Sequence, residues 1–296
     1  SEMYDIMLTL WDRYCDWQAE ALNYLIGAEE YNVIFSHNHV VDAQMHAIAR
    51  NMVHRDYSPY SAETARDYME KVYIQTDNYI GKFLHYIDEG WTVFLVSDHA
   101  QVASEYEPLM MGDTTGVNVR LMQELGLCDT VKDADGTERY EFDWTKTYAV
   151  AQRGNHIYLN IKGRDKHVLA DGTVIDGLID PADQYEWEEE VMTRLYNYKH
   201  PVSGKRTIAL ALRNRDAVLL GLGGPESGDI LYWNAEGYNY DHCDSLSTTY
   251  GCRGTSVGPF FVAAGKGLKK GFKTERIIRQ VDVTPTVAYL AGVRMP

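Results

Sequence analysis

The chain has 296 residues, with 28 Lys and Arg against 43 Asp and Glu, and its formal net charge is −15 at pH 7. Proteins that hold nucleic acid or an anionic membrane surface by electrostatics need an excess of basic residues, so this charge argues against both kinds of partner. Hydrophobic residues make up 45% of the chain and aromatic residues 12%, which excludes a disordered protein. The length allows two domains, or one large α/β domain with an insertion.

No transmembrane or secretory segment is predicted. The longest apolar runs, such as residues 93–96, are far shorter than the roughly 18 residues of a membrane-spanning helix. The first 20 residues carry five acidic side chains, which a signal peptide does not tolerate. The chain begins with Ser1 rather than Met, so we expect it to be a piece of a longer protein. Its cellular location is not indicated.

The four cysteines are scattered and contain no C-x-x-C pair. Sparse cysteines of this kind are typical of free thiols rather than of a disulfide framework or a structural zinc site. A bridge between Cys243 and Cys252 is the one alternative. The other two cysteines are Cys15 and Cys128.

The first hundred residues alternate between helix and strand patterns. Apolar residues over 4–26 recur at three- and four-residue steps and predict an amphipathic helix. Residues 33–35 predict a short buried strand. Ser61 can cap a second helix that extends to about residue 90, and residues 91–96 predict another buried strand. Strand, helix and strand in this order are typical of a parallel sheet covered by helices.

The middle of the chain has a weaker pattern, which indicates an inserted α+β cap over residues 102–228. Gly-Asp, Asp-Gly and Pro-Glu breaks separate its short apolar runs. A helix is predicted over 182–198, behind Pro181. The predicted strands are 148–152, 156–161, 207–212 and 217–220.

The closing segment indicates that the sheet resumes. Residues 259–263 predict a strand, and residues 284–291 predict a helix. The expected fold class is therefore α/β, with a central, mostly parallel sheet flanked by helices. Residues 1–101 and 229–296 would form this metal-binding core, and the cap would be inserted between them.

Acidic and imidazole side chains follow two of the predicted strands. Functional groups in open α/β sheets collect beyond the carboxyl ends of strands. Asp42 and His46 have an i,i+4 spacing that can place both on one face, and carboxylate with imidazole suits Zn²⁺. Asp98 and His99 come directly after the second strand. They can share a metal only if the strand has already turned into a loop, because neighbours in a strand point to opposite faces.

Three further histidines are candidates for the same site. His242 lies in a polar loop before the final strand, and His37 and His39 could be hydrogen-bond partners of the ligands. For every candidate the alternative is a solvated surface side chain. The chain contains no P-loop, no dinucleotide fingerprint and no G-x-S-x-G elbow.

These elements resemble the C-terminal portion of the alkaline phosphatase superfamily, in particular its type I phosphodiesterase/nucleotide pyrophosphatase family. Asp42 and His46 match the spacing of one ligand element of the family, and residues 97–100 (Ser-Asp-His-Ala) match its Asp-His element. Residues 154–165 resemble a strand that ends in an Asn-x-Lys-Gly-Arg run, and segments within 259–286 resemble the family's closing motifs. The likeness covers nearly the whole chain, in the family's order.

The resemblance implies an alkaline-phosphatase-like fold with two zinc ions side by side. One ion would be held by Asp42, His46 and His242, and the other by Asp98, His99, an N-terminal Asp and a Thr or Ser nucleophile. The nucleophile would attack a phosphodiester or pyrophosphate phosphorus in line and form a covalent intermediate that water opens. The substrate would be a small phosphate ester or a nucleotide.

Two departures from the family bear on this expectation. Cys243 follows His242 where the family commonly has Gly. Only 41 residues precede Asp42, and their only Ser and Thr hydroxyls belong to Ser1, Thr9 and Ser36, none in a nucleophile-like loop. The nucleophile is therefore expected upstream of Ser1. The missing N-terminal half of the same protein would then be a partner, and this chain alone would be inactive.

Two alternatives to a phosphodiesterase remain open. The same metal scaffold serves phosphonate hydrolases, phosphomonoester hydrolases and phosphomutases, which substrate profiling separates. A non-catalytic metal-binding fragment is the second alternative, and a bare activity assay distinguishes it.

Overall fold

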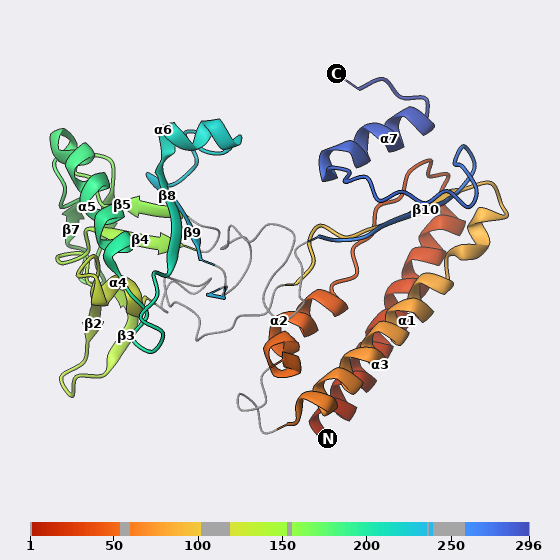
Figure 1. The fold of residues 1–296 in the computed structure, drawn as a ribbon, viewed down its shortest axis with the longest axis horizontal. Coiled ribbons are helices and arrows are strands. Elements are labelled where there is room, and N and C mark those ends of the chain that lie inside the picture. Colours follow the sequence, from red (N-terminus) through yellow and green to blue (C-terminus); the bar gives the residue numbers. More distant parts are fainter. Residues whose placement is uncertain are drawn as a thin grey trace. The chain divides into compact units, whose positions relative to one another are not determined.

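The computed structural model describes residues 2–53, 60–101, 119–152, 156–235, 237–238 and 258–295. The chain divides into two compact units (Figure 1). Unit 1 comprises residues 1–102 and 255–296, and unit 2 comprises residues 103–254.

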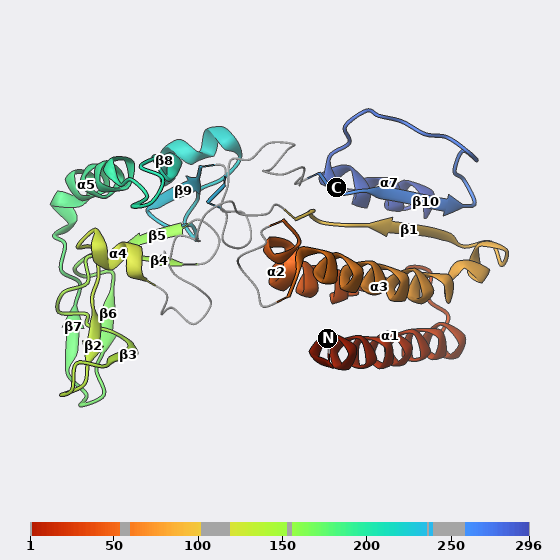
Figure 2. The same ribbon diagram turned by 60° about the horizontal axis from the view of Figure 1, so that its bottom comes forward.

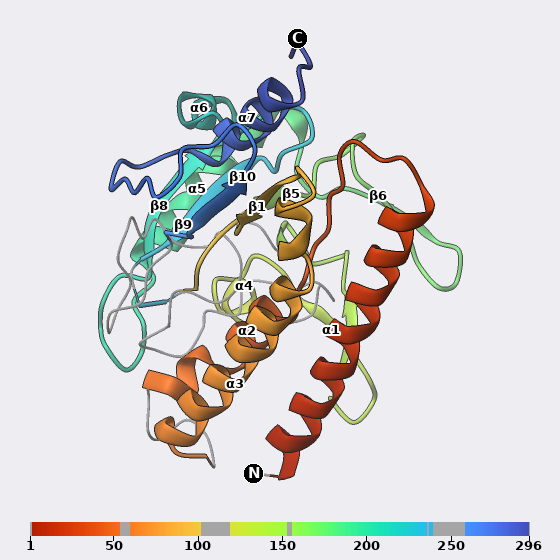
Figure 3. The same cartoon turned by 90° about the vertical axis from the view of Figure 1, so that its right-hand side faces the viewer.

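Three helices form the core of unit 1. They are α1 (Glu2–Ala28), α2 (Val40–Val53) and α3 (Ala62–Gly81). α3 packs against both α1 and α2, and Figure 3 shows α1 running alongside α3. Their buried residues include Ala19, Val40, Tyr68 and Met69. The predicted cap of α3 is confirmed, because Ser61 Oγ accepts a hydrogen bond from Thr64 N at 3.1 Å.

A two-stranded antiparallel sheet completes unit 1. Strand β1 (Thr92–Val96) follows the 3-10 helix η1 (Leu84–Ile87) and pairs with β10 (Phe261–Gly265). The 3-10 helix η5 (Gln280–Asp282) then leads into α7 (Val283–Leu290). Figure 2 shows α1, α3 and the strand pair stacked in that order.

Gly265 fixes the end of this strand pair. Its φ is 130°, in the region that favours glycine, and an added Cβ would lie 2.3 Å from the carbonyl oxygen of Trp91. Only glycine therefore fits where β10 ends opposite Thr92.

Unit 2 is built on a four-stranded antiparallel sheet with the order β4-β5-β9-β8. Its strands are β4 (Ala149–Gln152), β5 (His156–Leu159), β8 (Ile208–Arg213) and β9 (Ile230–Asn234). Two hairpins, β2–β3 and β6–β7, extend from it. The other elements are α4 (Arg120–Glu124), β2 (Thr130–Lys132), β3 (Glu138–Phe142), β6 (Lys166–Val168), β7 (Val174–Asp176), η2 (Pro181–Asp183), α5 (Gln184–Asn197), α6 (Asn214–Ala217) and η3 (Val218–Leu220).

Two predicted strands are wrong. Residues 33–35 form no strand: they lie in an irregular connection in which the side chain of Phe35 is 92% exposed, so the run has neither a partner strand nor cover. Residues 217–220 end α6 and form η3, because Asn214 begins a helical turn that closes at Gly221 with a φ of 73°. The helix predicted to about residue 90 ends at Gly81 and is followed by η1, and the other predicted helices and strands are confirmed to within a few residues of their ends.

The described strands form small sheets. Every pair of named strands among the described residues is antiparallel, and β9 pairs with β5 and β8 inside unit 2. Unit 2 therefore includes β9 and extends to residue 254, and the division into a core of residues 1–101 and 229–296 and an inserted cap of residues 102–228 stays a prediction. The mostly parallel central sheet stays a prediction. No helix among the described residues is both long enough and apolar enough to cross a membrane.

Candidate metal centre

The segment that leads into α2 is tied to α1 by hydrogen bonds. Gln18 Nε2 donates to the carbonyl oxygen of His37 at 2.6 Å. The Asn38 side chain donates to Gln18 Oε1 at 3.3 Å, and its Oδ1 accepts from the backbone N–H of Val40 at 3.1 Å. These bonds fix where the chain enters α2.

Asp42 lies in the first turn of α2, where a carboxylate is favoured by the helix dipole. The carbonyl of His39 accepts the hydrogen bond from Ala43 N at 3.0 Å, so His39 is the residue that caps this turn. The opposite face of α2 is held by a buried contact with α3, in which Tyr68 Oη donates to Gln44 Oε1 at 2.5 Å. Asp42 is therefore presented from a helix that is anchored on both sides.

His99 reaches the same place from the end of β1. The strand ends at Val96, and the next residues form a turn in which Ser97 Oγ donates to the carbonyl of His99 at 2.7 Å. His99 Nδ1 donates to the carbonyl of Ala100 at 3.0 Å, since a carbonyl oxygen only accepts. In the neutral imidazole this bond leaves the lone pair on Nε2, the form that binds a metal.

The structure brings Asp42, His46 and His99 together. Asp42 Oδ1 lies 3.2 Å from His46 Nε2 and 3.5 Å from His99 Nε2, and the three ligand atoms all lie within 4.8 Å of one another. Asp42 Oδ1 is buried and accepts no hydrogen bond of acceptable geometry from any described residue. A buried carboxylate oxygen without a hydrogen bond is costly, which indicates that a further group satisfies it.

Two of these separations match the spacing of ligand atoms around one metal ion. The ligand atoms of tetrahedral Zn²⁺, with bonds of about 2.0–2.1 Å, lie about 3.3–3.4 Å apart. The two separations measured from Asp42 Oδ1 bracket this value. Two imidazoles and one carboxylate are also a donor set that suits Zn²⁺ and other first-row metals better than Mg²⁺ or Ca²⁺.

The imidazoles set the charge state of Asp42. Burial raises the pKa of this carboxyl group, but the neighbouring His46, His39 and His99 outweigh burial and hold the pKa below its ordinary value. Asp42 is therefore a carboxylate over the whole neutral range. An ionised carboxylate between imidazoles is ready to accept a cation without first losing a proton.

The remaining candidates are placed differently. The Asp98 side chain is 73% exposed, with Oδ2 3.8 Å from His99 Nε2, and lies at the edge of the cluster. His39 Nε2 donates to Asp42 Oδ2 at 2.5 Å. The His37 ring lies 5.2 Å from the His39 ring. His242 lies outside the described residues, so its role as third ligand of the first metal stays a prediction.

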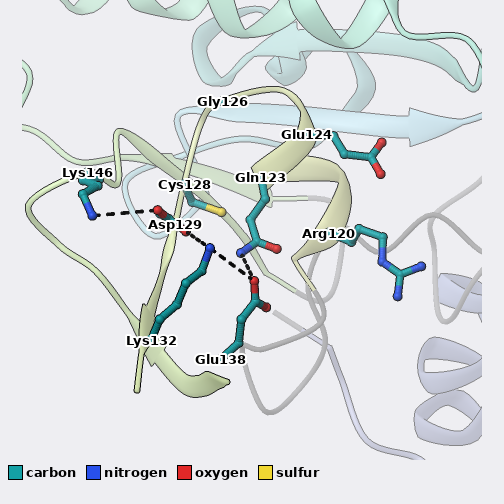
Figure 4. Close-up of a pocket in the computed structure, with 9 residues that line it drawn as sticks. All are labelled: Arg120, Gln123, Glu124, Gly126, Cys128, Asp129, Lys132, Glu138 and Lys146. Atoms are coloured by element: carbon teal, nitrogen blue, oxygen red, sulfur yellow. Dashed lines mark hydrogen bonds and ion pairs between the residues drawn. The ribbon is translucent and has the colours of Figure 1, made fainter. Parts of the chain in front are cut away.

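Unit 2 has an open hollow with a volume of about 530 Å³, shown in Figure 4. Its lining has three basic and three acidic side chains. Lys146 and Lys132 point toward Asp129, and Lys132 also approaches Glu138. The hollow therefore presents no surplus charge of one sign to a ligand. Its lining residues are Arg120, Gln123, Glu124, Gly126, Cys128, Asp129, Lys132, Glu138 and Lys146.

The sequence interpretation missed helix α2, which carries two of the three clustered residues. The signal was present, because Val41, Met45, Ile48 and Met52 recur at three- and four-residue steps. It also missed the polar contacts of Gln18 and Gln44, which have no pattern of their own in the sequence.

Comparison of the chain with protein-family models, with curated proteins and with solved structures found no match in any of the three.

Proposed function

We propose that this chain carries the metal-binding part of a zinc-dependent hydrolase that acts on phosphodiester or pyrophosphate bonds of small phosphate esters or nucleotides. One observation carries the proposal: the buried Asp42 Oδ1 lies between the Nε2 atoms of His46 and His99 at separations suited to tetrahedral zinc. The resemblance to type I phosphodiesterases supplies the reaction class.

The order of the units along the chain supports the same proposal. Unit 2 interrupts unit 1 between residues 102 and 255. The clustered ligands come from the end of β1 and from α2, and residues beyond a strand end are where α/β enzymes place functional groups. We propose that unit 1 belongs to an alkaline-phosphatase-like core and that unit 2 is its insertion.

A divalent cation at this cluster would polarise a phosphoryl oxygen and offset the charge that develops during displacement. The chain's own residues supply the charge and the ligand orientation that such a cation needs. Asp42 supplies the negative charge, and the bond from His99 Nδ1 to Ala100 directs the Nε2 lone pair toward the carboxylate. In the proposal, Asp98 and His242 complete the ligands for two zinc ions.

The proposed reaction also needs a nucleophile. Ser97 is the hydroxyl nearest to His99 along the chain, but its Oγ already donates to the His99 carbonyl at 2.7 Å. Thr114 and Thr115 lie outside the described residues. We propose that a Thr or Ser from outside this chain is the nucleophile, so that hydrolysis by the chain alone is negligible.

Calorimetric titration of the zinc-loaded chain with inorganic phosphate tests this function without requiring turnover. We expect phosphate binding by the wild type, loss of binding in Asp42→Ala, and no change in Asp67→Ala, which removes an exposed carboxylate on α3. Zinc binding without phosphate binding would contradict the hydrolase and favour a non-catalytic metal-binding module.

Hydrolysis assays separate the substrate classes. Bis-p-nitrophenyl phosphate, p-nitrophenyl phosphate and p-nitrophenyl phenylphosphonate are diester, monoester and phosphonate probes. Robust diester hydrolysis by the chain alone would overturn the proposal that the nucleophile lies elsewhere. Hydrolysis confined to the monoester or the phosphonate would replace the phosphodiesterase with one of its relatives.

A further inference from the structure

The two carboxylate oxygens of Asp42 have different partners. Oδ1 is buried and faces the Nε2 atoms of His46 and His99. Oδ2 accepts a hydrogen bond from His39 Nε2 at 2.5 Å. This second bond restricts the rotation of the carboxylate about its Cβ–Cγ bond. Oδ1 is then the oxygen that is directed at the cluster.

His39 is placed to hold Asp42 by its position in the chain. It is the residue before α2, and its carbonyl already accepts the bond from Ala43 N. Asp42 follows three residues later, in the first helical turn. Side chains three residues apart at a helix start face each other, so the contact is set by local geometry.

The His39 side chain contributes little to the packing of the fold. It is 60% exposed, so its loss removes little buried surface. The backbone around it is fixed independently by the contacts of Gln18 with His37 and Asn38. A contribution of this imidazole is therefore expected at Asp42 rather than in the stability of the fold.

We infer that His39 is a positioning residue for the metal site: its Nε2–H orients the Asp42 carboxylate so that Oδ1 binds the metal together with His46 and His99. This inference rests on the proposed metal site. Groups that hold a metal ligand by a hydrogen bond typically contribute 10–100-fold to metal affinity.

Cobalt binding tests the inference, because Co²⁺ reports ligand geometry through its visible absorption as well as its affinity. The full chain is titrated with Co²⁺, and Zn²⁺ affinity is obtained by displacement. His39→Ala should weaken binding by about 10–100-fold and leave the shape of the cobalt spectrum unchanged. His39→Gln keeps an N–H donor at a similar distance from the backbone and should restore most of the affinity.

The matched control is His37→Ala, which removes a neighbouring imidazole whose ring lies 5.2 Å from that of His39. It should bind Co²⁺ like the wild type. The thermal unfolding midpoint of each metal-free variant should equal that of the wild type. This comparison separates positioning from a folding defect.

The outcomes distinguish the inference from the function on which it rests. Wild-type affinity in His39→Ala would overturn the positioning role and leave the metal site intact. A changed spectrum, with no recovery in His39→Gln, would make His39 a direct ligand and also overturn it. Absence of Co²⁺ and Zn²⁺ binding by the wild type would overturn both the inference and the metal-dependent function.

Discussion

Strands β9 in unit 2 and β1 and β10 in unit 1 are all largely apolar, but they differ in how deeply they are buried. All five residues of β9 in unit 2 are buried, whereas neither β1 nor β10 in unit 1 contains a buried residue. All three are largely apolar runs of the kind that fills a sheet interior. An apolar run therefore predicts a strand, but it does not predict what covers the strand.

The two units also differ in the size of their cores and in the polar side chains that they bring together. Unit 2 has a large core in which Ile157, Ile208 and Ile230 are fully buried, and its hollow is lined by equal numbers of basic and acidic side chains. Unit 1 carries the Asp42–His46–His99 cluster, and its buried residues belong to the three helices and their flanks.

The largest expected effect on stability lies in unit 2. Asp229 accepts two hydrogen bonds from Arg164, at 2.7 and 2.9 Å, and a third from Leu159 N at 2.7 Å. Asp229→Ala leaves these donors without their acceptor, and we expect it to lower the free energy of unfolding by about 3–5 kcal/mol. Asp67→Ala in unit 1 breaks an exposed pair with Lys71 and should have no measurable effect in the same urea titrations.

A matched leucine substitution probes the two kinds of strand directly. Leu231 in β9 is 2% exposed, and Leu231→Ala should cost about 2–5 kcal/mol of unfolding free energy. Leu95 in β1 is only half-buried, and Leu95→Ala should cost about 1–2 kcal/mol.

Amide hydrogen exchange measures both leucine effects separately in each unit. Faster exchange should be confined to the unit that carries the substitution. Equal costs at the two positions would show that β1 is covered as well as β9 is.

The smallest expected effect concerns the reactivity of the cysteine thiols. Burial, with smaller contributions from Asp129 and Glu138, raises the pKa of the Cys128 thiol to about 12. At pH 8 this thiol is therefore protonated and should resist iodoacetamide in the native protein. Burial also raises the pKa of Cys15 in unit 1. Under denaturing conditions four thiols should titrate. A count of two would mean that Cys243 and Cys252 are bridged.

Local patterns predicted the helices α1, α3, α5 and α7 and the strands β1, β4, β5, β8 and β10, but neither the remaining elements nor the strand pairing. The helices over 4–26 and 182–198 and the cap at Ser61 follow from side-chain spacing, which is a local property. The run at 33–35 failed because three apolar residues do not specify a partner strand. β9 was missed because its run follows several glycines and a proline, which indicated a loop.

The candidate site was predicted in part. The spacing of Asp42 and His46 and the position of His99 after a strand singled out all three clustered residues. The resemblance placed these residues together at one two-zinc site, but spacing alone could not predict their grouping, because it depends on a tertiary contact between α2 and the end of β1. The prediction assigned His99 to a second metal, whereas the structure places its Nε2 3.5 Å from Asp42 Oδ1.

Zinc binding by the His99→Ala variant tests the central claim most directly. In competition with a chromogenic chelator, the wild-type chain should bind about one Zn²⁺ tightly, since three protein ligands and water make an open zinc site. His99→Ala, like Asp42→Ala, should lose this tight site, and His85→Ala, which removes an exposed imidazole beside Glu89, should keep it. Wild-type zinc affinity in His99→Ala would contradict a metal centre formed by Asp42, His46 and His99.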